Sequence, residues 1–216
     1  MTKEEYLIIR QTGMSFSSML FKEKLNDKDD VHNAGKLLGL LKEGKFIFES
    51  DDDSDALTDY LIFERNKKGT RFIQKFYDSD VELPDLEEEL LEAMLDSHAS
   101  LFEVNKIDSE NYTLILTDIL DKNRKEYKLF DLGYSQTAKL GHIFFTRLLP
   151  VREVNITSGL MFLFDSIHKD RLFADISFAR FKNNNHLNSS GLFVLIHKKY
   201  RFYGKEVQRL ETDQLL

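Results

Sequence analysis

The residues best suited to binding chemistry lie near the C-terminal end of the chain, in the run LFVLIHKKYRFYGK. Cations neutralise phosphates and aromatic rings stack on bases, so a segment in which the two alternate is typical of a nucleic-acid surface. The spacing of Phe193, Ile196 and Tyr200 equally fits the apolar face of an amphipathic helix with its basic residues in water. The candidate partner or nucleic-acid surface consists of Lys198, Lys199, Tyr200, Arg201, Tyr203 and Lys205.

A second group centres on Arg147, in the run GHIFFTRLLP. Alternation along a strand places Arg147 on the same face as Ile143 and Phe145. A guanidinium among apolar neighbours is costly unless it is paired. The expected partners are Asp118 and Asp131, at the ends of neighbouring strands. We expect a structural ion pair that stabilises the sheet rather than a ligand contact.

No pattern in the chain matches a catalytic or metal-binding motif. Cysteine is absent, which excludes disulfides, thiolate metal sites and cysteine nucleophiles. The acidic run at residues 49–55 has aspartates spaced as in a calcium loop, but the glycine of that loop would fall at Ala56 and its glutamate at Ile62. The six histidines lack helical metal-pair spacing, and no phosphate-binding glycine motif or G-x-S-x-G elbow occurs. We expect no catalytic, cofactor or metal site; a hydrolase or transferase with a dispersed site is the alternative.

Charge is distributed unevenly along the chain, whose formal charge is −7. Residues 1–98 hold 13 Lys/Arg and 23 Asp/Glu, a balance of −10, whereas residues 99–216 hold 17 and 14, a balance of +3. Between Ser166 and Lys205 there are eight basic residues and two acidic ones. This asymmetry favours either a match between the two halves, which is the simpler interpretation, or an anionic partner for the C-terminal half.

Composition predicts a soluble protein without membrane association. A chain of 216 residues, 42% hydrophobic and 31% charged, is long enough to bury a core without disulfides or metals. The N-terminal run MTKEEYLIIRQTG is too acidic for a secretory signal. The longest apolar run, GLMFLF, is far shorter than the roughly 20 residues that span a bilayer. We therefore expect a cytoplasmic location.

The elements that must position these residues begin with helices. Thr2 and Glu5 form a capping-box pattern, and a short helix should follow and end near Gly13. A second short helix is predicted over 15–25, and a third from Val31, capped by Asp29 or Asp30. A further helix is predicted from a cap at Ser54 or Asp55 through Leu57 to Glu64, and another from residue 84. A strand is predicted in KFIFES, and residues 70–77 fit either a helix or a strand.

Between residues 100 and 164 the apolar period changes from 3.6 to 2. Five strands at roughly ten-residue spacing predict a small curled antiparallel sheet that could close as a barrel. Helices follow over 165–181 and from a cap at Ser189 or Ser190 to Gly204. The fold class is therefore α+β, with a mainly helical region at 1–98 and a sheet with C-terminal helices at 99–216, expected to pack as one compact unit.

Roughly residues 54–160 resemble a region found in uncharacterised bacterial proteins. The resemblance rests on DYLIFERNKKG, LEEELLEAMLDSHASLFEV, TLILTDIL and S-x5-G-x5-RLLP, the last of which contains Arg147. Many of those proteins carry a cysteine-rich SEC-C zinc motif elsewhere, which this cysteine-free chain lacks. The resemblance implies a bacterial origin and no particular activity.

These observations predict a non-catalytic interaction or docking module whose partner is another protein or a second copy of the chain. The alternative is an RNA- or DNA-binding protein that uses the sheet and the basic C-terminal helix.

Overall fold

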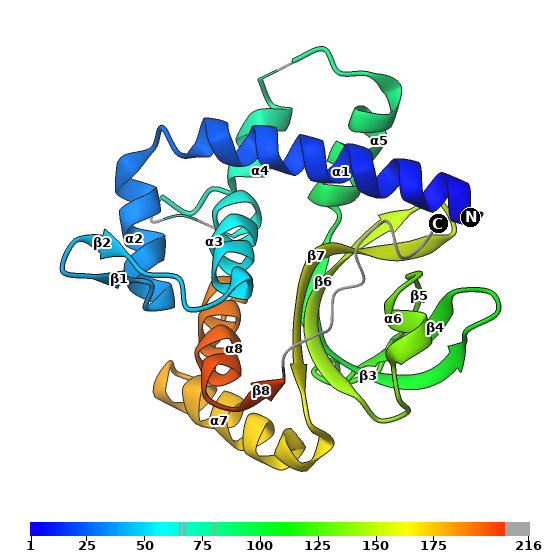
Figure 1. Ribbon diagram of the computed structural model, residues 1–216. Helices are drawn as coiled ribbons and strands as arrows, with labels where there is room; N and C mark the ends of the chain where they lie inside the picture. Colours follow the sequence, from blue (N-terminus) through cyan, green and yellow to red (C-terminus); the bar gives the residue numbers. More distant parts are fainter. Residues whose placement is uncertain (65, 67, 80, 206–216) are drawn as a thin grey trace. The chain divides into compact units, whose positions relative to one another are not determined.

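The chain consists of two units, each held together by its own internal contacts: an N-terminal unit, Met1–Ser97, and a C-terminal unit, His98–Leu216. The computed structural model describes residues 1–64, 66, 68–79 and 81–205 (Figure 1). Helices dominate the first unit, and the second contains a curled sheet followed by helices. The predicted α+β class is confirmed.

Five helices and one short hairpin make up the described part of the N-terminal unit. The hairpin has only two residues per strand, so most of the strand predicted in KFIFES is irregular. Residues 72–77, which fitted a helix or a strand, form a helix. The elements are α1 Lys3–Lys24, α2 Lys28–Leu38, β1 Leu41–Lys42, β2 Lys45–Phe46, α3 Asp51–Phe63, α4 Phe72–Tyr77 and α5 Asp85–Leu95.

Helix α1 is continuous, so the prediction of two short helices broken near Gly13 was wrong. Its predicted start is confirmed, because Thr2 and Glu5 form the capping box. A glycine inside a helix costs about 1 kcal/mol relative to alanine. Packing of one face along the whole helix, from Ile9 to Leu20, outweighs that cost.

Two other helix starts differ from the prediction by a few residues. Helix α2 is capped by Asp27, whose side chain accepts the Asp30 amide, and not by Asp29 or Asp30. The acidic run at 51–53 forms the first turn of α3, where carboxylates favour the positive end of the helix dipole. A helical turn is not a calcium loop, which agrees with the failed motif match.

The sheet of the C-terminal unit has the strand order β5-β4-β3-β6-β7-β8. Neighbours are antiparallel, except that β5 also meets β7 in parallel, through Leu129 and Asn155. The Asn155 side chain donates a hydrogen bond to the Lys128 carbonyl at 3.0 Å and reinforces this contact. The sheet is thus a closed barrel of mixed direction, not a purely antiparallel sheet. Its strands are β3 His98–Asp108, β4 Thr113–Asp118, β5 Glu126–Phe130, β6 Ile143–Val151, β7 Val154–Phe164 and β8 Gly204–Lys205.

Around the barrel the strands come in the order β3, β4, β5, β7, β6. Counted along the chain, these are the first, second, third, fifth and fourth strands, and the third and fifth run parallel. Helix α6, Tyr134–Thr137, lies between the third and fourth strands. This is the connectivity of the OB-fold, a five-stranded barrel that many proteins use as a binding scaffold. Connectivity describes the scaffold and does not assign a ligand.

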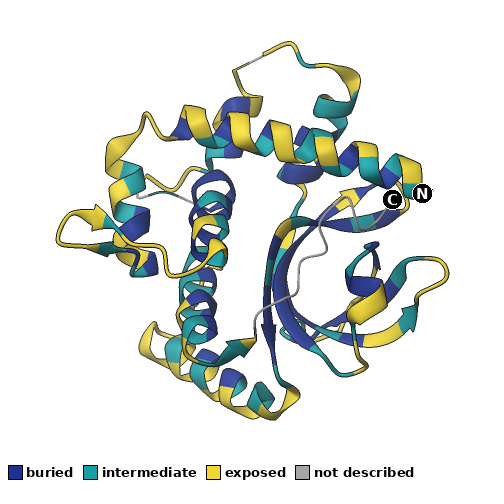
Figure 2. Cartoon of the chain, in the orientation of Figure 1, coloured by how far each residue is buried: buried dark blue, intermediate teal, exposed yellow. Residues whose placement is uncertain are grey.

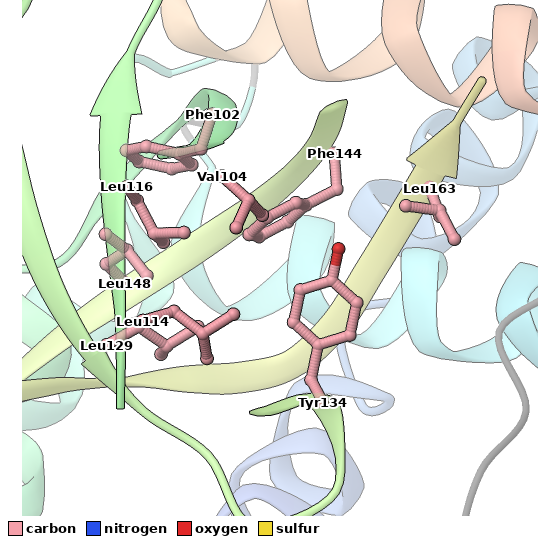
Figure 3. Packing of buried hydrophobic residues seen from close by; sticks show 9 residues of the cluster. All are labelled: Phe102, Val104, Leu114, Leu116, Leu129, Tyr134, Phe144, Leu148 and Leu163. Carbon is pink, nitrogen blue, oxygen red and sulfur yellow. The ribbon is translucent and has the colours of Figure 1, made fainter. Parts of the chain in front are cut away.

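Side chains fill the barrel (Figure 3). Phe102 and Val104 of β3 point inward beside Phe144 of β6, and the ring of Tyr134 packs edge-on against Phe144 at 5.2 Å. Because the interior is packed, chemistry at the barrel is confined to its ends and outer face. The labelled core residues are Phe102, Val104, Leu114, Leu116, Leu129, Tyr134, Phe144, Leu148 and Leu163.

Three helical segments follow the barrel: the 3₁₀ turn η1 Ser166–His168, α7 Lys169–Lys182 and α8 Ser189–Tyr203. Helix α8 is capped by Asn188, one residue before the predicted cap, and ends at Gly204 as predicted. It covers the outer face of the sheet with Phe193, whose ring meets those of Phe145 and Phe162 edge-on at 5.6 and 6.0 Å. This packing orients every residue of the predicted basic surface.

Candidate functional site

The predicted surface on α8 is partly used in internal contacts. The Lys199 ammonium lies 2.8 Å from the Asp175 carboxylate of α7, and the Lys205 ammonium lies 2.6 Å from Asp165. The hydrogen bond from Lys205 holds the pKa of the Asp165 carboxyl below its usual range. Lys198 is exposed. Two of the four predicted cations therefore already neutralise carboxylates of the same unit.

The tyrosines of that surface also have structural contacts. The Tyr200 ring is buried and stacks on Phe162 at 4.8 Å, while its hydroxyl donates to the Lys205 carbonyl. The Tyr203 hydroxyl donates to Asp175 at 3.1 Å, and burial together with that carboxylate raises the pKa of Tyr203 to about 12. The Tyr200 ring is therefore not available as a stacking platform, and the half-buried Tyr203 is held by its hydrogen bond to Asp175.

Arg147 is buried in β6, opposite Ala99 of β3. In the same ladders Phe102 pairs with Phe144 and with Asp118, so Asp118 shares the face of Phe144. Since successive strand residues face opposite sides, Arg147 lies on the other face of the sheet from Asp118. The ion pair of Arg147 with Asp118 or Asp131 stays a prediction, and this register does not favour Asp118.

The polar cluster at one end of the barrel is built around Asp118 instead. His98 begins β3 and Ser100 follows on the same face, and both reach the last residue of β4. His98 Nε2 lies 2.7 Å from Oδ2 of Asp118, and Ser100 Oγ donates to Oδ1 at 2.7 Å. The backbone amides of Leu120 and Asp121 donate to the same Oδ1 at 2.9 and 3.1 Å.

The Asp118 side chain is only 3% exposed, and that of His98 is 47% exposed. Burial disfavours the charged carboxylate, but the hydrogen bonds from His98, Ser100 and the Leu120 amide outweigh it and lower the pKa of Asp118. Because an ionised carboxylate only accepts, His98 Nε2 carries the hydrogen in this bond. The His98 ring also stacks on Tyr127 at 5.8 Å.

This cluster contains serine, histidine and aspartate but not in the order of a hydrolase. In a catalytic triad the hydroxyl donates to the imidazole, which donates to the carboxylate. Here Ser100 and His98 both donate to Asp118, and a carboxylate of lowered pKa is a poor base for a hydroxyl. The geometry fits a structural clamp that ties residues 119–121 to β3.

A second histidine contact lies at the start of β6. The Tyr134 hydroxyl is 3.2 Å from Nδ1 of His142, and the Lys139 amide donates to the same nitrogen at 3.3 Å. Burial first, and then the Lys139 charge, lower the pKa of His142, while burial raises the pKa of Tyr134. A neutral imidazole and a neutral phenol stabilise this loop and provide no activated group.

Among the described residues of the N-terminal unit, Lys24 is the buried cation. Its ammonium lies 2.6 Å from Asp30 and 3.1 Å from Asp27, and 5.6 Å from the centre of the Phe72 ring. The cavity beside it has a volume of about 10 Å³, which holds one water molecule at most. Among the described residues no group of three or more His, Asp or Glu could hold a metal ion.

The surface that the sequence argument missed lies on α7. Leu172 and Ile176 are the buried positions of this helix, whereas Phe178 and Phe181 are 57% and 74% exposed. With 3.6 residues per turn, both rings lie on the side away from Leu172 and Ile176. Much of α7 is exposed (Figure 2). No signal in the sequence marks this surface, because phenylalanines at helical spacing predict a buried face just as well as an exposed one.

Two exposed cations share the last turns of α7 with these rings. On the helical wheel Lys182 lies about 40° from Phe178, whereas Arg180 lies about 100° from Phe181, toward the side of Ile176. The Lys182 ammonium lies 4.6 Å from the centre of the Phe178 ring. We call Phe178, Arg180, Phe181 and Lys182 the α7 face.

A comparison with protein families matches nearly the whole chain to a family. The sequence model of a family of unknown function, DUF7986, matches residues 1–209. The chain belongs to this family. The DUF7986 match extends well beyond residues 54–160 in both directions, and it provides no link to SEC-C proteins. No curated protein and no solved structure matches this DUF7986 chain, and no described helix is long and apolar enough to cross a membrane.

Proposed function

We propose that this DUF7986 protein is a non-catalytic docking module that binds an acidic, amphipathic protein segment on the α7 face. The observation that carries the proposal is the pair of exposed rings, Phe178 and Phe181, on a helix whose opposite side is already packed. Large exposed apolar side chains that gather on one helix face mark interaction surfaces more often than isolated ones do.

Burial of these rings is a sufficient driving force for a specific contact. A phenylalanine buries about 200 Å² when fully covered, and each Å² contributes about 25 cal/mol. Covering the exposed parts of Phe178 and Phe181 would contribute about 6 kcal/mol before the entropic cost of association. Aromatic side chains that become buried in this way commonly serve as the anchors of an interface.

The charge around the rings indicates the chemistry of the partner. From Ile176 to Lys205 the chain contains six basic residues and no Asp or Glu. Lys182 lies over the Phe178 ring and Arg180 in the same last turn of α7, where acidic residues that flank an apolar stripe would meet them. Charge complementarity of this kind increases the association rate and fixes the register.

The test is a titration of the full chain into a labelled helical peptide with leucines on one face and glutamates beside them. We expect saturable binding that weakens between 0.05 and 0.5 M salt, as for any contact with a large charge component. The double variant F178A/F181A should bind at least about 30-fold more weakly, since truncation of an anchor residue typically costs this much affinity. The matched control I8A removes a side chain that is 59% exposed on α1 and should leave binding unchanged.

No peptide binding by the wild-type chain, or equal binding by F178A/F181A, would refute the proposal. Circular dichroism of both variants provides the folding control, because the substituted side chains are exposed.

The second candidate function is binding of single-stranded RNA or DNA. What favours it is the OB-type strand connectivity together with the exposed Lys198. What weakens it is the engagement of Lys199 and Lys205 in ion pairs and of both tyrosines in packing or hydrogen bonds. On this hypothesis a labelled oligonucleotide binds at low salt, loses affinity as salt rises and binds K198E less well. Binding that does not respond to salt would exclude it.

A further inference from the structure

The chain itself contains a segment with the charge that the α7 face would bind. From Phe76 to Asn105 there are ten Asp or Glu residues and no Lys or Arg. This acidic stretch and the basic stretch from Ile176 to Lys205 are each 30 residues long and of opposite charge. Where exposed residues of two such stretches form complementary surfaces, their opposite charge directs association between chains.

Helix α5 presents this charge on one side. Its buried residues, Leu90, Leu91, Ala93 and Met94, form one face. Asp85, Glu88 and Glu92 are exposed and recur at the spacing of a single helix face on the opposite side. Val81, four residues before the start of the helix, is 52% exposed and supplies an apolar side chain to this part of the chain. We call Val81, Asp85, Glu88 and Glu92 the α5 face.

We infer that the occupant of the α7 face is the α5 face of a second copy of this chain. This inference rests on the proposed docking function and names its partner. Phe178 and Phe181 would cover Val81 and the neighbouring apolar positions, and Arg180 and Lys182 would meet Glu88 and Glu92. Each copy carries both faces, so the contact closes as a dimer on a two-fold axis or continues into larger species.

The exposed side chains on both faces make the test direct. Sedimentation velocity of the full chain at increasing concentration should show a self-associating species that dissociates at 0.5 M salt. The variants F178A/F181A, R180E/K182E and E88K/E92K should each weaken association at least about tenfold, and folding is checked by circular dichroism. The control K36E/K122E makes the same change of charge as R180E/K182E at two exposed lysines outside both faces and should associate as the wild type does.

Mixing separates this contact from a general effect of charge. R180E/K182E and E88K/E92K each carry one reversed face, so together they can form one contact in which acidic α7 residues meet basic α5 residues. We expect the mixture to form a heterodimer at concentrations where each variant alone, weakened at least about tenfold, does not associate.

Three results would overturn the inference: a wild-type chain that is monomeric at every concentration, association that survives all three variants, and a mixture that stays monomeric. If the wild-type chain is monomeric but still binds the acidic peptide through Phe178 and Phe181, the docking function stands and its partner is another protein. If neither binding occurs, both proposals are refuted.

Discussion

Replacement of Asp118 by asparagine tests the clamp at the end of the barrel. Asp118→Asn keeps the size of the side chain but removes its charge and one of its two acceptor oxygens. The carboxylate accepts from His98, Ser100 and two backbone amides while its side chain is 3% exposed. Loss of a buried charge that satisfies several donors costs about 3 kcal/mol. We expect D118N to lower the free energy of unfolding by that amount at pH 7.

The pH dependence of this effect provides an independent check. Because the pKa of Asp118 is lowered by folding, its ionisation stabilises the fold above the unfolded value of about 3.9, and this stabilisation is lost as the pH falls through the folded value. The difference between wild type and D118N should therefore shrink below about pH 4. Urea unfolding followed by circular dichroism at pH 7 and at pH 3.5 measures both quantities.

The matched control is D121N, three residues along the chain. The Asp121 carboxylate accepts the Asn123 amide in an exposed turn, so its replacement should change stability by less than about 0.5 kcal/mol. If D118N is no more destabilising than D121N, or if its effect does not shrink in acid, the clamp interpretation is wrong.

Two further substitutions test the packing of α8, which lies against α7, and a third tests the start of α1 in the N-terminal unit. Phe193→Ala should cost about 4 kcal/mol in thermal or urea unfolding, because the ring is fully buried between the sheet and α8; a cost below 1 kcal/mol would contradict that packing. Gly204→Ala should cost about 2 kcal/mol, since a Cβ there would lie 2.6 Å from the Tyr200 carbonyl oxygen and closer still to its ring; an unchanged midpoint would argue against this helix end. Thr2→Ala should cost about 1 kcal/mol and release Glu5 from the capping box, with loss of helical circular dichroism at the start of α1; no change would mean that this end is already frayed.

Local patterns in the sequence predicted the elements well. The period of two identified the runs that became β3, β4 and β6, and the capping box at Thr2 fixed the start of α1. These signals work because they depend on neighbours within a few residues. The continuity of α1 through Gly13 could not be predicted, because it depends on tertiary packing that outweighs a local propensity.

The clamp could not be predicted because it depends on register. His98 and Asp118 are 20 residues apart, and their contact follows only when Phe102 pairs with Asp118 across β3 and β4. A shift of one residue would turn Asp118 to the opposite face. The parallel contact of Leu129 with Asn155, which closes the barrel, is similarly invisible to a strand-by-strand pattern.

The exposed rings of α7 illustrate a different limit. Its phenylalanines occur at positions 173, 178 and 181, and only the fold shows that the last two face away from Leu172 and Ile176. Of the residues that attracted attention in α8, Lys199 and Tyr203 contact Asp175 of α7 and Tyr200 stacks on Phe162 of β7, whereas Lys198 is exposed. Composition indicated the basic character of this part of the chain, and packing decided which side chains are available.

The most direct test of the docking account is chemical-shift mapping of the isotope-labelled chain as the acidic amphipathic peptide is added. The account predicts that the largest amide shifts fall in Ser177 to Lys182 of α7, that they saturate, and that they disappear in F178A/F181A. Shifts that centre instead on the outer faces of β4 and β5, or no saturable shift at any peptide concentration, would contradict it.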